Sequence, residues 1–193
     1  MIDDEASKWD ARYRTAPAVT PQPARAVAQY AHLLPPRGKA LEVACGLGGN
    51  ALLLARLGLH TEAWDISAVA IERLRSLAQE QGLTLTATQR DVLVEPPAAA
   101  GYDVIVVTRF LDRSLCPALA AALRPDGLLY YQTFVQERVT DHGPGNPAFL
   151  LAPGELLQLF PGLLPLAYHD EGRIGDPARG WRDEACLVAQ KPR

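Results

Sequence analysis

Short apolar runs alternate along the chain with longer segments whose apolar positions recur at helical spacing. Short runs bounded by Gly, Pro and Asp predict β-strands, whereas the helical spacing predicts amphipathic helices. The predicted strands begin at Ala40 and cover residues 40–43, 60–64, 83–88, 103–107 and 128–134. The predicted helices cover residues 24–34, 51–57, 68–81, 114–123 and 155–160.

The alternation of strands and helices indicates a parallel sheet with helices on both faces, which is the doubly wound α/β class. The run 83–88 alternates apolar residues with threonines, so we expect it near an edge of the sheet. The run 104–107 is apolar throughout and should be buried on both faces. Two later runs, 164–168 and 185–189, have no helix between them and should pair antiparallel at the sheet edge.

The length of 193 residues fits one domain, spanning 1–193, with an N-terminal segment, 1–36, and a core, 37–193. Trp9 and Tyr13 give the N-terminal segment an aromatic and charged character. Two interpretations are open: a lid that folds over a ligand, or a helix that buries both aromatic rings against the core.

A tight glycine turn follows the first predicted strand. Gly46 and Gly48 permit a sharp turn and let the backbone approach a ligand where a Cβ would collide. Glu42 lies at the end of that strand, and Asp65 and Asp91 follow the second and third strands. Because the carboxyl ends of parallel strands meet at one edge of the sheet, the three carboxylates should face one crevice. Asp65 lies at the offset where a carboxylate binds the two ribose hydroxyls of a nucleotide-like ligand.

Composition narrows the class of partner. A formal net charge of -3 argues against broad contact with nucleic-acid phosphates. The three cysteines are widely separated and show no metal-ligand spacing, which predicts a reduced cytoplasmic protein without a structural metal. The acidic first residues do not resemble a signal peptide, and no apolar stretch is long enough to span a bilayer.

The chain resembles the class I S-adenosylmethionine (SAM)-dependent methyltransferases, whose Rossmann-like sheet has seven strands and ends in an antiparallel pair. Within that class, residues 42–50 (EVACGLGGN), 63–65 (AWD) and 153–156 (PGEL) are similar to the bacterial tellurite-resistance methyltransferase family. This similarity implies methyl transfer to a small-molecule acceptor such as a chalcogen oxyanion or a thiol. The resemblance covers nearly the whole chain and implies S-adenosyl-L-methionine as the cofactor.

The resemblance implies a set of cofactor contacts. Glu42, Gly46 and Gly48 would hold the methionine moiety and the turn beneath it, and Asp65 would hold the ribose. Ala44 stands where many family members carry a glycine, which matters little if the position is still on the strand. The remaining expected contacts are Asn50 near the turn, Ile66, Asp91 and Val92 around adenine, and Thr108 and Arg109 after the fourth strand.

For methyl transfer the protein must align the acceptor with the cofactor and exclude water, and a strong base is needed only if the acceptor is protonated. For a small anionic acceptor, cationic and hydrogen-bonding side chains are the candidates. Arg109 and His142 are the expected catalytic residues, Arg109 because the end of a central strand opens on the crevice. The expected substrate-binding residues are Arg12, Tyr13, Arg173 and Arg182, although arginines are most often solvated surface residues.

Other functions fit parts of the same pattern. Gly46-x-Gly48-x-x-Ala51 also fits an NAD-dependent oxidoreductase, but little chain remains for a substrate domain. A SAM-binding protein without catalysis is a further alternative. Residues 146–149 (NPAF) are similar to the signature of nucleobase amino-methyltransferases, but that signature follows the fourth strand and here the tetrapeptide follows the fifth.

Overall fold

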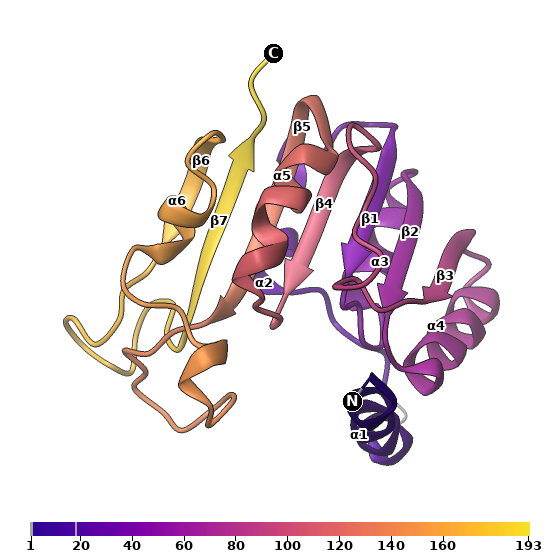
Figure 1. Cartoon of the computed structure of the whole chain (residues 1–193), viewed down its shortest axis with the longest axis horizontal. Helices are drawn as coiled ribbons and strands as arrows, with labels where there is room; N and C mark the ends of the chain where they lie inside the picture. Colours follow the sequence, from indigo (N-terminus) through magenta and orange to yellow (C-terminus); the bar gives the residue numbers. More distant parts are fainter. Residues whose placement is uncertain (1, 18) are drawn as a thin grey trace.

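The computed structural model describes residues 2–17 and 19–193 (Figure 1). Within these residues one seven-stranded sheet has the order β3-β2-β1-β4-β5-β7-β6. The strands β3, β2, β1, β4 and β5 are parallel to one another, and β7 is antiparallel to both β5 and β6. The bounds are β1 Lys39–Val43, β2 His60–Asp65, β3 Leu85–Gln89, β4 Tyr102–Thr108, β5 Leu123–Phe134, β6 Leu164–His169 and β7 Glu184–Gln190. The predicted doubly wound sheet with a terminal antiparallel pair is therefore confirmed.

Helices lie on both faces of the sheet. Successive residues of a strand point to opposite faces, so in β4 Val106 packs in the cluster that holds Leu54, while Ile105 packs with Leu119 on the other face. The α-helices are α1 Ile2–Thr15, α2 Arg25–Gln29, α3 Gly49–Arg56, α4 Ala68–Glu80, α5 Cys116–Ala122 and α6 Glu155–Leu159. Short 3-10 turns are η1 Ala31–Leu33, η2 Arg113–Leu115 and η3 Pro147–Phe149. None of the helices described is both long and apolar enough to cross a membrane.

Two predicted elements begin or break differently. The predicted helix 24–34 is divided at Tyr30 into α2 and η1, because Tyr30 leaves helical geometry with φ -105° and ψ 21°. The third strand begins at Leu85, two residues later than predicted. The N–H of Leu83 donates to the carbonyl of Ala78 at 2.9 Å, so this residue closes the end of α4 before the strand starts.

The fifth strand begins earlier than predicted. Leu123, placed at the end of a helix by its periodicity, pairs with Tyr102 as the first residue of β5. Residues 124–127 are accommodated by a shift in the β4–β5 register between Tyr102 and Val104, and Asp126 has φ 64°. The helix before it is short because Asp112 first caps the 3-10 turn η2, its carboxylate accepting from the N–H of Ser114 at 2.9 Å.

Candidate functional site

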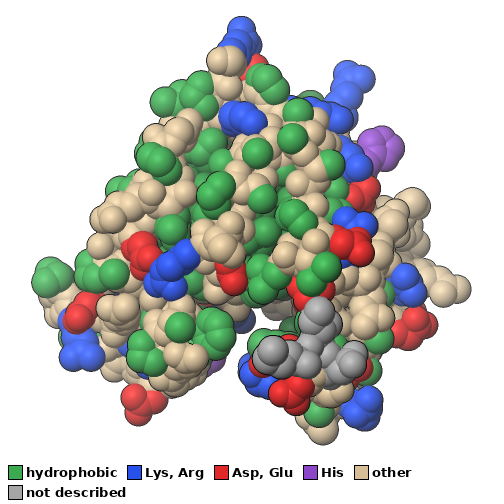
Figure 2. Space-filling model, in the orientation of Figure 1, with side chains coloured by type: hydrophobic (Ala, Val, Ile, Leu, Met, Phe, Trp, Pro, Cys, Tyr) green, Lys and Arg blue, Asp and Glu red, His purple; other side chains and the backbone are tan. Residues whose placement is uncertain are grey.

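The carboxyl ends of β1, β2 and β4 meet at the lower edge of the molecule in Figure 1, with α1 on one side and the loop 136–150 on the other. Figure 2 shows a notch in this edge between the two lobes that these segments form. Most buried polar side chains gather near these strand ends: Glu42, Asn50, Asp65, Ser67, Gln132, Thr133 and Glu184. Each described buried side-chain nitrogen or oxygen has a hydrogen-bond partner.

The glycine turn is held by the carboxylate of Asp65. One Asp65 oxygen accepts from the N–H of Gly46 at 2.7 Å and the other accepts from the N–H of Ser67 at 2.9 Å. Each carboxylate oxygen has two lone pairs, so both retain one for a ligand hydroxyl. Burial raises the pKa of Asp65, and the two N–H donors oppose that shift. Asp65 can therefore hold the turn and the ribose hydroxyls of a nucleoside at the same time.

The turn has the left-handed backbone that its glycines predict, and Ala44 shares it. Gly46 has φ 52° and Gly48 has φ 77°, while Ala44, with φ 51°, lies just beyond the end of β1. Position 44 is therefore not on the strand, so the condition under which its alanine would matter little is not met. A glycine there would be less strained.

Glu42 supports the turn from below. Its two oxygens accept from the side-chain amide of Asn50 and from the N–H of Ala51, both at 2.7 Å. Burial raises its pKa to about 8 against these two hydrogen bonds. Asn50 also donates to the hydroxyl of Thr108 at 3.1 Å and accepts from the N–H of Ala24 at 2.7 Å. Glu42 and Asn50 thus join β1, α3, β4 and the N-terminal segment at the centre of the site.

The residues expected around adenine occupy the end of β3 and the start of α4. Asp91 caps its own turn, its carboxylate accepting from the N–H of Leu93 at 2.9 Å. Val92 is buried in the core cluster beneath the site, and Ile66 is half-buried with its carbonyl accepting from Gln89 at 3.1 Å. These positions flank Asp65, as an adenine pocket beside the ribose requires.

The N-terminal segment is a packed helix that also reaches the glycine turn. Asp10 of α1 accepts from the hydroxyl of Ser67 at 2.5 Å and from the N–H of Val69 at 3.2 Å. A Cβ built on Gly46 would lie 2.7 Å from the hydroxyl oxygen of Tyr13. Burial, and then the charge of Asp65, raise the pKa of Tyr13 well above its usual value. Arg12 is exposed, with its guanidinium 5.2 Å from the ring of Trp9.

Arg109 lies at the end of β4 in an unusual conformation, with φ 55°. Its Nε donates to Glu184 at 2.8 Å, while its side chain stays 59% exposed. The other oxygen of Glu184 accepts from the side-chain amide of Gln132, whose oxygen accepts from the N–H of Ala26 at 2.8 Å. Sequence reasoning missed Gln132 and Glu184, although Gln132 lies inside a predicted strand and Glu184 lies directly before another.

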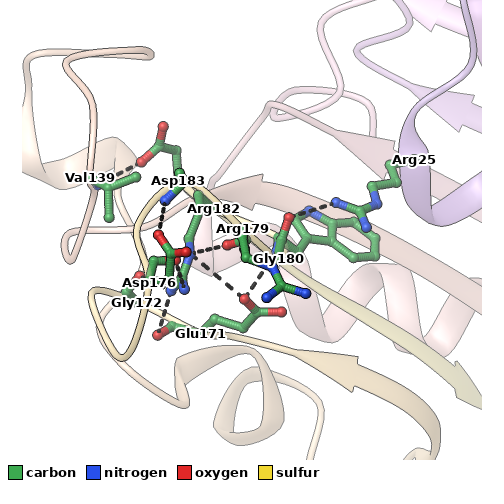
Figure 3. Close-up of polar contacts among 11 residues, drawn as sticks. Arg25, Val139, Glu171, Gly172, Asp176, Arg179, Gly180, Arg182 and Asp183 are labelled. Atoms are coloured by element: carbon green, nitrogen blue, oxygen red, sulfur yellow. Dashed lines mark hydrogen bonds and ion pairs between the residues drawn. The ribbon is translucent and has the colours of Figure 1, made fainter.

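Two other residues predicted for the site, His142 and Arg173, lie in the loops that follow β5 and β6. His142 is exposed, with its ring edge-on to Phe134 at 5.5 Å between centroids. Arg173 donates to the carbonyl of Arg138 at 2.9 Å and lines a pocket with Arg138 and Thr140. Asp183 joins the two loops by accepting from the N–H of Val139 at 2.7 Å (Figure 3).

Arg182 is the centre of the loop between β6 and β7 (Figure 3). Its guanidinium donates to four backbone carbonyls of that loop, those of Glu171, Gly172, Asp176 and Arg179, at 3.4, 3.0, 2.7 and 2.6 Å. The side chain is only 13% exposed. The structure therefore gives Arg182 a role in holding the loop, which the sequence did not indicate.

A second anchor fixes the loop after β5. Arg113 of η2 makes two hydrogen bonds to the carboxylate of Glu155, at 2.6 and 3.0 Å, and donates to the carbonyls of Ala148 and Leu150. The residues 146–149, similar to a nucleobase-methyltransferase signature, thus form the turn η3 docked on Arg113 after β5. This is not the place after β4 that the signature requires.

Comparison with known proteins agrees with this geometry. The profile of the family described as "Methyltransferase domain" matches residues 40–127, which span β1 to the start of β5 and include the glycine turn and Asp65. This match covers slightly less than half of the chain. Together with the seven-stranded sheet, this confirms the class I SAM-dependent methyltransferase resemblance, and S-adenosylmethionine is the cofactor of this domain.

Curated relatives differ in what they act on. The ribosomal protein L11 methyltransferase of Dechloromonas aromatica (strain RCB) is 28% identical over 155 residues, covering 79% of this chain and 43% of the relative. The ubiquinone biosynthesis O-methyltransferase of Histophilus somni (strain 2336) is 27% identical over 164 residues, covering 79% and 65%. The chain thus spans less than two thirds of the length of either relative.

Two solved structures share the fold. TehB from Haemophilus influenzae superposes with a TM-score of 0.70 at 22% identity, covering 97% of this chain and 67% of that chain. A structure from work on the conversion of a disulfide bond into a thioacetal group during echinomycin biosynthesis has a TM-score of 0.72 at 22% identity, covering 97% and 92%. At this identity, the likeness supports the fold.

Proposed function

We propose that the protein transfers the methyl group of S-adenosylmethionine to a small acceptor whose nucleophile is anionic, a chalcogen oxyanion or a thiolate. The observation that carries this proposal is the exposed cation of Arg109. Its guanidinium is exposed at the end of β4, beside Thr108, which shares a hydrogen bond with the Asn50–Glu42 group under the glycine turn. A cation beside the cofactor turn favours a negatively charged acceptor.

Different residues would bind different parts of the cofactor. The backbone of the glycine turn and the carboxylate of Asp65 would hold the nucleoside and methionine parts, with Tyr13 closing the turn from α1. S-adenosylmethionine supplies a methyl group on a sulfonium, which a nucleophile displaces in line. The protein must therefore align the acceptor and exclude water, and no side chain need remove a proton from an acceptor that is already anionic.

The acceptor residues would come from the end of β4 and from both sides of the notch. Arg109 would bind the charge of the acceptor, and His142, Arg12 and Arg173 would contribute from the flanking loop and helix as the sequence predicted. The similarity of residues 42–50 and 153–156 to the tellurite-resistance methyltransferase family supports a chalcogen acceptor. The NAD-dependent alternative is not favoured, because the methyltransferase-domain profile covers the glycine turn.

Calorimetric titration with S-adenosylmethionine, S-adenosylhomocysteine and NAD in parallel tests the cofactor. We expect micromolar binding of the two adenosyl compounds and none of NAD. Binding of NAD in their place would contradict the proposal.

Transfer of labelled methyl groups from S-adenosylmethionine then tests the acceptor. Selenite, tellurite and a small thiol are the expected acceptors, and a catechol, offered below its first pKa, is the neutral control. Methylation of the catechol alone would overturn the anionic acceptor while leaving the methyltransferase assignment intact.

A further inference from the structure

A chain of three hydrogen bonds runs from the start of α2 to the guanidinium of Arg109. The N–H of Ala26 donates to the side-chain oxygen of Gln132 at 2.8 Å, and the side-chain nitrogen of Gln132 donates to Glu184. The second oxygen of Glu184 accepts from Nε of Arg109 at 2.8 Å. Gln132 is 2% exposed and Glu184 is 8% exposed, so these hydrogen bonds lie inside the protein and only the Arg109 side chain reaches solvent.

The N–H of Ala26 fixes which atom donates in each of the three hydrogen bonds. A backbone N–H can only donate, so it must face the oxygen of Gln132, and the amide nitrogen of Gln132 must then face Glu184. Glu184 is left with one oxygen for Arg109. The backbone of α2 thereby determines which atom each side chain presents to the next.

The contact leaves Arg109 ready for a ligand. A free arginine side chain loses up to about 2 kcal/mol of conformational entropy when it is immobilised. Glu184 holds Nε, and within the described residues the two terminal NH₂ groups of Arg109 make no hydrogen bond. Those two groups form the fork that binds the paired oxygens of an anion. The backbone at Arg109 is also strained, with φ 55°, which is typical of residues held in place for function.

We propose that Glu184 and Gln132 are positioning residues, which set Arg109 to bind the anionic acceptor of methyl transfer. This inference rests on the proposed function, because it assigns the acceptor side of the same site. A purely structural role, tying α2 to the sheet, would change stability and would leave the affinity for an anion unaltered.

The substitution Glu184→Gln tests whether position 184 must accept both hydrogen bonds, from Gln132 and from Arg109. The new NH₂ group must face either the amide nitrogen of Gln132 or Nε of Arg109, and both are donors, so one hydrogen bond is lost. We expect the affinity for selenite, measured by calorimetry on the complex with S-adenosylhomocysteine, to fall about tenfold, the effect of losing roughly 1.4 kcal/mol of a charge-assisted contact. The affinity for S-adenosylhomocysteine should stay within about twofold, and an unchanged selenite affinity would overturn the proposal.

The double substitution Gln132→Glu with Glu184→Gln provides the rescue. The new carboxylate at position 132 can accept from the N–H of Ala26 and from the new amide at position 184, whose oxygen can then accept from Arg109. Every hydrogen bond is restored, so we expect selenite affinity to return to within about twofold of the original. This variant also folds with a satisfied interior if the single variant does not, and failure to recover affinity in the folded double variant would contradict the positioning role.

Two further variants separate positioning from general effects. In an Arg109→Ala background, Glu184→Gln should have no additional effect on selenite affinity, because its partner is gone. Glu62→Gln is the matched control: Glu62 also pairs with a cation, Lys39 at 2.8 Å, and accepts from a buried side chain, that of Tyr102, but lies in β2 away from the strand ends. It should leave selenite affinity unchanged, and a loss equal to that of Glu184→Gln would overturn the assignment.

The same experiments distinguish this inference from the proposed function. If the original protein binds neither selenite nor tellurite but methylates a thiol, Arg109 is not an anion site and the positioning proposal fails while methyl transfer stands. If selenite binds with the expected dependence on Glu184 but no acceptor is methylated, the positioning role stands and the proposed function fails.

Discussion

The two sides of the notch are built from different kinds of contact. On the cofactor side, Asp65 bonds to residues 19 and 2 positions away along the chain, and Glu42 to residues 8 and 9 positions away. On the acceptor side, Arg109 and Glu184 are 75 positions apart, Glu184 and Gln132 are 52 apart, and Gln132 and Ala26 are 106 apart. The carboxylate contacts of the cofactor side lie within residues 42–67, around the β1–α3–β2 unit, whereas the acceptor side exists only when the whole sheet has formed.

The largest effect should come from filling the glycine turn on the cofactor side. A Cβ on Gly48 would lie 2.3 Å from Cδ1 of Leu74, and φ 77° disfavours any L-residue there. We expect Gly48→Ala to lower the free energy of unfolding by about 3 kcal/mol, from overpacking and backbone strain together. Chemical denaturation measures it.

Leu74→Ala provides the control for this clash. In that background the added methyl group enters space that the leucine has left, so the cost of Gly48→Ala should fall to that of the backbone strain, about 1–2 kcal/mol. Strictly additive effects would show that the two side chains do not compete for one space.

Asp65→Ala should separate cofactor binding from folding. It removes both the acceptors for ribose hydroxyls and the support of Gly46, so we expect the affinity for S-adenosylhomocysteine to fall about a hundredfold, as for two hydrogen bonds to a charged group. Calorimetry gives the affinity and thermal unfolding gives the fold. Unchanged affinity would remove Asp65 from the site, and Asp91→Ala, on an exposed turn of its own, provides a comparison at the next strand end.

Local patterns explain what the sequence revealed and what it did not. Gly46, Gly48 and Asp65 were predicted because a glycine turn and an acidic strand end are spaced by the geometry of one βαβ unit. Gln132 and Glu184 carried no such spacing, since their contact depends on how β7 returns beside β5. The fold itself followed from hydrophobic periodicity, while the element ends at Leu83 and Leu123 were decided by a local hydrogen bond at the end of α4 and by strand pairing.

Local pattern could not place two further residues. Whether Ala44 lies on the strand was open from the sequence, and only the path of the chain out of β1 shows its left-handed conformation. Arg182 resembled a ligand for an anion, yet its donors are directed to carbonyls of its own loop. A cation in a loop cannot be assigned from sequence until the partners that the loop brings to it are known.

The pH dependence of stability should reveal the buried carboxylate under the turn. Burial raises the pKa of Glu42 from 4.5 to about 8, so between these values the folded protein binds more protons at this group than the unfolded chain does. Its contribution is fully present below pH 4.5 and is lost as pH rises through 8, with a slope of at most about 1.4 kcal/mol per pH unit.

Glu42→Gln removes this titration. Denaturation of both proteins at several pH values from 5 to 8 should show a steeper loss of stability with rising pH in the original than in the variant. Parallel curves would show that Glu42 remains ionised in the folded protein, held by Asn50 and the N–H of Ala51. Glu62→Gln, on a partly exposed carboxylate, is the matched control and should leave this part of the curve in place.

The smallest effect concerns the two non-glycine residues that leave β1 and β4 in the left-handed conformation, Ala44 with φ 51° and Arg109 with φ 55°. Glycine relieves strain of about 1–2 kcal/mol at such a position but gives the unfolded chain more freedom, so the backbone change alone should stabilise the protein by about 0.5–1 kcal/mol. Ala44→Gly should do so with methyl transfer unchanged, because the cofactor side uses the backbone of the turn. Arg109→Gly should not show this gain, because it also leaves one oxygen of the buried Glu184 without its partner, and it should abolish anion binding. Denaturation and selenite titration of the two variants, measured side by side, check both expectations. Unchanged selenite binding in Arg109→Gly would show that the strained backbone at the end of β4 does not present this side chain to the acceptor.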